Sequence, residues 1–123
     1  MKEEIRAPKA PMPSGPYSQG LKVGNRIYVA GQRPYDVETG IMPDDIQGQC
    51  KQVLENVRHV LQAAGADMQH VVQVSVYLEK LEDFGVFNEV YKEYFEQPYP
   101  VRTTIGCSLR GQKRVEVGVI AEV

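Results

Sequence analysis

The 123-residue sequence lacks tryptophan and has no long uninterrupted apolar run. A membrane-spanning helix needs about 20 consecutive apolar residues, so none is expected. The N-terminal segment MKEEIRAPKAPMPSGP also has no apolar core of signal-peptide length. The cytoplasm is therefore the expected location. A chain of this length fits a single domain over residues 1–123 with one sizeable core.

The few cysteines and histidines do not form a pattern that holds a disulfide or a metal ion. Cys50 and Cys107 lie far apart in apolar-patterned stretches, which predicts two buried thiols. His59 and His70 are separated by eleven positions and show no zinc-ligand spacing. We expect no metal site and interpret both histidines as surface or boundary residues.

The chain also lacks an excess of basic charge. Its 14 Lys and Arg against 16 Asp and Glu give a net charge of −2, and 42% hydrophobic with 24% charged residues is typical of a soluble globular protein. No basic run provides the footprint of a phosphate-backbone binder. Nucleic acid is disfavoured as a partner, although folding can still assemble a local basic patch.

Apolar periodicity predicts strands and helices in the order β-β-α-β-α-β-β. The strands are expected within 17–23 and over 26–31, 72–78, 102–109 and 113–123, and the helices over 46–64 and 84–95. This order implies one mixed sheet with both helices on one face. Val71 and Ile120 give the second face apolar character, and subunit association is one way to cover it.

Arg102 opens a predicted strand after Pro100 and Val101. Strand alternation places it on the same side as Thr104, in a polar stripe that ends in a fixed charge. A guanidinium at a strand end suits bidentate capture of a small carboxylate. A surface or interface ion pair explains the same arginine equally well from its spacing alone.

Glu116 lies among strand-forming apolar residues in VEVGVIAEV. This environment suits either proton transfer or a structural ion pair. Gly118 beside it leaves space for a ligand or for close backbone packing. A hairpin about Gly111 would set Arg102 opposite roughly Glu122 and far from Glu116. The dense apolar character of 115–121 suits instead a central strand that is not paired with its predecessor, and the sequence leaves both arrangements open.

Five motifs occur in order along nearly the whole chain: GPYSQG, VAGQ, LEDFGVFNEVYKEYF, PVRTTIGCSL and VEVGVIAEV. In these motifs the chain resembles the RidA family, also called YjgF and formerly labelled endoribonuclease L-PSP. The resemblance implies a chorismate-mutase-like α+β fold, a mixed six-stranded sheet with two helices on one face. It further implies a homotrimer with a cleft at each subunit boundary, and a central final strand.

The same resemblance implies hydrolysis of 2-imino or enamine acids, such as 2-iminobutanoate and 2-iminopropanoate, to 2-oxo acids and ammonia without a cofactor. Arg102 would bind the substrate carboxylate, and Glu116 would position or activate the attacking water. Tyr17 and Asn88 would line the cleft, with backbone contacts from Gly31 and from the main chain at Thr104. Tyr17 fits equally well a packed aromatic residue with a hydrogen-bonded hydroxyl.

Three departures from the family pattern bear on the substrate. Ala30 stands where the archetypal branch has a serine, Thr104 where it has a cysteine, and Gly118 where a second acid is common. A bulkier imine or an aminomuconate-like enamine therefore stays open as substrate. Two rival functions are a regulatory module that binds a small carboxylate without turnover and a ribonuclease. The ribonuclease is disfavoured because the chain has no histidine pair and no basic stripe.

Overall fold

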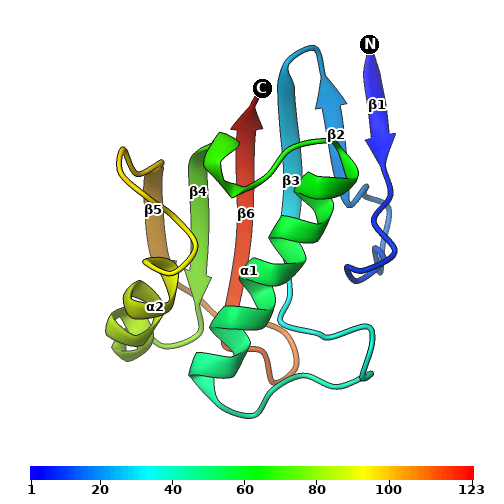
Figure 1. The fold of residues 1–123 in the computed structure, drawn as a ribbon. Coiled ribbons are helices and arrows are strands. Elements are labelled where there is room, and N and C mark those ends of the chain that lie inside the picture. The colour runs from blue at the N-terminus through cyan, green and yellow to red at the C-terminus, as the bar shows by residue number, and fades with distance from the viewer.

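The computed structural model of the chain describes residues 1–123, which form six strands, two α-helices and two 3-10 helices (Figure 1). The elements in chain order are β1 (Lys2–Ile5), β2 (Gly20–Val23), β3 (Arg26–Gln32), α1 (Ile46–Ala63), η1 (Met68–His70), β4 (Val71–Leu78), η2 (Leu81–Asp83), α2 (Phe84–Tyr91), β5 (Val101–Gly106) and β6 (Val115–Glu122). Neither α-helix combines the length and the apolar character that crossing a bilayer requires.

All strands join one sheet in the order β1-β2-β3-β6-β4-β5. The β4–β5 pair is parallel, and every other neighbouring pair is antiparallel. Figure 1 shows both α-helices on the same side of the sheet, with α1 across its middle and α2 near β5. This confirms the predicted α+β fold of a mixed six-stranded sheet with two helices on one face.

Helix α1 supplies much of the core. Asp45 caps its start by accepting a hydrogen bond of 3.0 Å from the Gly48 N–H. The chain leaves the helix through Gly65, whose φ of +83° lies in the left-handed region that favours glycine. The residues of α1 that are fully buried in the core are Cys50, Val53, Leu54, Val57, Val60 and Leu61. Each large apolar side chain among them contributes roughly 1.5–3 kcal/mol on burial.

Strand β6 lies at the centre of the sheet, between β3 and β4. Its buried residues Val115, Val117, Val119 and Ala121 belong to the core, whereas Glu116, Gly118 and Ile120 are half-buried and point to the other side, here termed the open face. Strand β5 pairs with β4 and not with β6. The hairpin about Gly111 therefore does not form, and the central-strand alternative holds.

Three elements differ from the predicted ones, and one of them, β5, ends at Gly106 and not at residue 109. Strand β1 is not predicted, because its residues KEEI are short and mostly charged, as suits a sheet edge. Helix α2 ends at Tyr91 and not at residue 95. Tyr94 and Phe95 keep the helical spacing of aromatics, yet the chain there turns instead of continuing the helix.

Two side chains are also placed differently from the prediction. Val71 is part of the buried core and does not contribute to the open face, because the register of β4 against β6 shifts between Val71 and Gln73. Cys107 is half-buried, since β5 ends at Gly106 before reaching it, while Cys50 is buried as expected. The apolar residues of the open face include instead Tyr28, Val101, Ile105 and Ile120.

Candidate functional site

Arg102 is held beside α2 at the edge of the sheet. Its Nη2 donates a hydrogen bond of 2.7 Å to Oδ1 of Asn88. The guanidinium carbon lies 4.7 Å from the ring centre of Tyr91 and 5.5 Å from that of Phe87, which are cation–π distances. Asn88 accepts a hydrogen bond from one nitrogen of Arg102, and the aromatic rings contact the face of the guanidinium. The remaining N–H donors of Arg102 are therefore free to bind an anion.

A cavity of about 450 Å³ opens beside this arginine, here termed the arginine cleft. Its lining consists of Gly85, Asn88, Glu89, Tyr91, Lys92, Tyr99, Pro100 and Arg102. Burial raises the pKa of Tyr91 to about 12, although the charge of Arg102 opposes this shift. Because of this raised pKa, Tyr91 contributes a neutral phenol to the lining of the cleft at ordinary pH, and its hydroxyl is buried without a hydrogen-bond partner.

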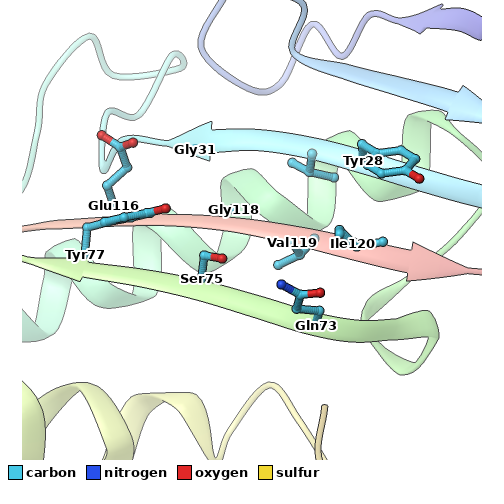
Figure 2. A pocket seen from close by; sticks show the side chains of 10 residues that line it. Tyr28, Gly31, Gln73, Ser75, Tyr77, Glu116, Gly118, Val119 and Ile120 are labelled. Atoms are coloured by element: carbon cyan, nitrogen blue, oxygen red, sulfur yellow. The ribbon is translucent and has the colours of Figure 1, made fainter. Parts of the chain in front are cut away.

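Glu116 lines a second hollow, on the open face, which we term the glutamate pocket. It has a volume of about 270 Å³ and is lined by Tyr28, Val29, Gly31, Gln73, Ser75, Tyr77, Glu116, Gly118, Val119 and Ile120. Figure 2 shows the Glu116 side chain rising from β6 at the end of β3, with Ser75 and Gln73 along β4. A Cβ atom at Gly31 would collide with Oε2 of Glu116, so the carboxylate occupies the space that this glycine leaves.

Lys113 is the ionic partner of Glu116. Its Nζ lies 3.3 Å from Oε1 of Glu116, and the two side chains are only 19% and 29% exposed. The sequence analysis missed this lysine, because it placed Lys113 in the predicted strand 113–123, where strand alternation points it to the opposite face from Glu116. The pair leaves Oε2 of Glu116 beside Gly31, without a charged partner.

Tyr17 lies in the segment before β2 and is 49% exposed. The Ser14 hydroxyl and the Ser14 N–H contact its Oη at 3.4 and 3.3 Å. These hydrogen bonds lower the pKa of Tyr17 in spite of some burial, and the positive charges of Arg33 and Lys113 act in the same direction. Tyr17 is thus within electrostatic reach of the lysine that pairs with Glu116.

Buried Gln19 fixes the segment that carries Tyr17, a role that the sequence analysis also missed. Its Oε1 accepts the Ala7 N–H at 2.7 Å, and its Nε2 donates to the carbonyl oxygens of Ala7, Ala10 and Pro11. In the sequence, Gln19 stood out only as part of the motif GPYSQG. Its hydrogen-bond partners lie many residues away along the chain, and no rule of sequence spacing predicts such contacts.

The predicted site residues fall into two groups on opposite faces of the sheet. Arg102 and Thr104 pair in register with the buried residues Val74 and Val76, on the helix side, where Asn88 also lies. Glu116 pairs with Tyr77 on the open face and touches the position of Gly31. Because Val74 and Tyr77 are an odd number of residues apart, they point to opposite faces. One chain therefore does not bring Arg102 and Glu116 together.

The two histidines lie outside both the arginine cleft and the glutamate pocket. His70 accepts the Asp67 N–H in the cap of η1, and His59 lies 3.1 Å from the Lys9 carbonyl oxygen. Both histidines thus contact the backbone and are half-buried, as a surface or boundary position predicts. No group of three or more His, Cys, Asp or Glu side chains is arranged to hold a metal ion.

Comparison with known proteins identifies the family. A family model described as Endoribonuclease L-PSP matches residues 7–123. A RutC family protein of Pyrococcus abyssi is 53% identical over 108 residues, which cover 87% of this chain and 85% of that protein. A Dermatophagoides farinae protein named 2-iminobutanoate/2-iminopropanoate deaminase is 39% identical over 124 residues, which cover 99% and 97%.

The structural comparison agrees with the sequence comparison. The crystal structure of Escherichia coli TdcF with bound serine superposes with a TM-score of 0.93 at 34% identity, covering 98% of each chain. The chain thus belongs to a class of small α+β proteins that share a mixed six-stranded sheet with two helices on one face. It belongs to the endoribonuclease L-PSP family, which is the RidA or YjgF family that its motifs resemble.

Proposed function

We propose that the chain hydrolyses reactive 2-imino or enamine acids, of the 2-iminobutanoate and 2-iminopropanoate type, to 2-oxo acids and ammonia. A relative that covers 99% of the chain is named for this reaction, and a solved relative holds serine, a small molecule with a carboxylate. The observation that carries the proposal is a cavity beside the guanidinium of Arg102, together with a separate pocket that holds the carboxylate of Glu116.

The proposed site is shared between two subunits of a homotrimer. Arg102 and Glu116 lie on opposite faces of one sheet, so a small substrate cannot contact both within one chain. If the open face of one subunit packs beside the arginine cleft of the next, the two groups approach the same substrate. The apolar residues of the open face, among them Tyr28 and Ile105, favour such packing.

In the proposed reaction, Arg102 binds the substrate and Glu116 accepts a proton from the attacking water. The substrate carboxylate binds the guanidinium of Arg102, which Asn88 orients. The oxygen of a water molecule bonds to the imine carbon while Glu116 takes its proton, and the C=N electron pair moves to the nitrogen, which gains a proton. The hydroxyl proton of the resulting carbinolamine is transferred to its amino nitrogen, the C–N bond breaks with its electron pair moving to that nitrogen, and ammonia leaves as the 2-oxo acid forms.

The test measures ammonia release from imines generated in situ by an amino-acid oxidase, and it compares the wild type with Arg102→Ala and Glu116→Gln. Arg102→Ala is expected to weaken 2-oxo acid binding by about 10- to 100-fold, because a charge-assisted hydrogen bond contributes roughly 1.5–3 kcal/mol. Glu116→Gln is expected to keep that binding and to lower kcat by about 100-fold or more. Turnover that survives in Glu116→Gln would contradict the water role. No acceleration by the wild type would favour the regulatory carboxylate-binding module.

A further inference from the structure

Lys113 is the one cation in direct ionic contact with the carboxylate of the glutamate pocket. The ammonium holds Oε1 of Glu116 at 3.3 Å, while Oε2 lies against Gly31. The carboxylate is thus confined from two sides, by a charge and by the backbone of the neighbouring strand. Both side chains are mostly covered, so water screens the contact less than it screens a surface ion pair.

The loop that carries Lys113 is anchored independently of Glu116. Arg114 forms a bidentate pair with Asp83, with contacts of 2.8 Å to Oδ1 and 3.2 Å to Oδ2. Gln49 of α1 accepts the Arg114 N–H at 2.8 Å and donates to the Gln112 carbonyl oxygen at 3.3 Å. Because both neighbours of Lys113 are bound to the helix side, the lysine begins from a fixed backbone as it extends to Glu116.

We infer that Lys113 is a positioning residue for Glu116. By holding Oε1, the ammonium fixes the carboxylate so that Oε2, above Gly31, is the oxygen that faces substrate and accepts the proton of the attacking water. The inference rests on the proposed function and deepens it. It differs from a substrate-binding role for Lys113, because the ammonium is already engaged with Glu116 and the substrate carboxylate is assigned to Arg102.

The kinetic test uses Lys113→Met, Lys113→Arg and the exposed helix variant Lys51→Met as a matched control. Lys113→Met is expected to lower kcat roughly tenfold, a part of the effect of a general base, and to leave the Kd of a 2-oxo acid unchanged. Lys113→Arg should restore most of kcat, since it restores the charge, and Lys51→Met should match the wild type. A weakened Kd with unchanged kcat would make Lys113 a ligand-binding residue, and no change in either quantity would equally overturn the inference.

A crystal structure of Lys113→Met tests the positioning without relying on turnover. Glu116 is expected to leave its place beside Gly31 or to occupy more than one conformer there. A carboxylate ordered in its original place would refute the positioning role. If the wild type does not release ammonia from any imine, the proposed function fails, and the structure of the variant still decides whether Lys113 holds Glu116.

Discussion

At the scale of single residues, the contact between Gly31 and Glu116 links the backbone of β3 to the proposed chemistry. A methyl group at position 31 would overlap Oε2 of Glu116 and approach its Cδ to 3.0 Å. The carboxylate is the mobile end of a side chain, so it can move aside at little cost in stability. At Gly118 an added Cβ would instead meet the backbone oxygen of Val29 at 3.2 Å, where less adjustment is possible.

We therefore expect Gly31→Ala to separate activity from stability. The displaced carboxylate should lower kcat about tenfold or more, while the free energy of unfolding changes by less than about 1 kcal/mol. Imine turnover and urea unfolding of the same preparations provide the two measurements. A variant that keeps full kcat would show that the position of Oε2 is not important.

The residues of the candidate site were predictable from the sequence to different degrees. Arg102 and Glu116 stand in motifs whose strand alternation gives each a face, and their assignment needed the family resemblance in addition. Lys113 was not predictable, because a residue three positions before Glu116 points to the opposite face in an extended strand. It contacts Glu116 because it lies before β6, which begins at Val115, so the alternation of a strand does not apply to it.

At the scale of elements, the loop between β5 and β6 connects stability to the site. Asp83 is 6% exposed and binds Arg114 through both of its oxygens. This pair ties the end of η2 to the residues that precede β6. Its loss would leave a guanidinium without its partner and would release the backbone on which Lys113 stands.

Asp83→Asn is accordingly expected to lower the free energy of unfolding by about 1–3 kcal/mol, because it removes a charge-assisted hydrogen bond whose Arg114 partner is 33% exposed and stays partly hydrated. Asp44→Asn, at an exposed loop position, is the matched control and should change it by less than about 0.5 kcal/mol. Urea unfolding at one fixed protein concentration measures both, because association also contributes to stability. Equal effects of the two variants would argue against the anchoring role.

The order of the elements followed from periodicity, but the pairing of the last strands did not. Apolar alternation in 115–121 is compatible with a hairpin and with a central strand, because the period of a strand does not reveal its neighbours. The parallel pairing of β4 with β5 places β5 at the sheet edge, so the last two strands do not form a hairpin and β6 is a central strand. Strand β1 was missed because its pairing with β2 is a backbone property that charged side chains do not signal.

At the scale of the whole molecule, the proposed shared site requires a second copy of the chain, because Arg102 and Glu116 lie on opposite faces of the sheet. The helix side of the sheet is covered by α1 and α2, whereas the open face presents Tyr28, Val101, Ile105 and Ile120 around the glutamate pocket. A homotrimer is the assembly that the resemblance implies, and light scattering at several protein concentrations measures it. The proposed shared site predicts more than association, because it requires one subunit to supply Arg102 and the next subunit to supply Glu116.

Mixing of variant subunits tests directly whether Arg102 and Glu116 of one site come from different subunits. Arg102→Ala and Glu116→Gln subunits, each inactive alone, are unfolded together in equal amounts and refolded. If each site takes Arg102 from one subunit and Glu116 from the next, random assembly makes about a quarter of the sites intact, so about a quarter of the wild-type activity should return. If both residues act within one subunit, no intact site can form and the mixture stays inactive. Refolded wild type, and each variant refolded alone, are the controls that separate this outcome from poor refolding.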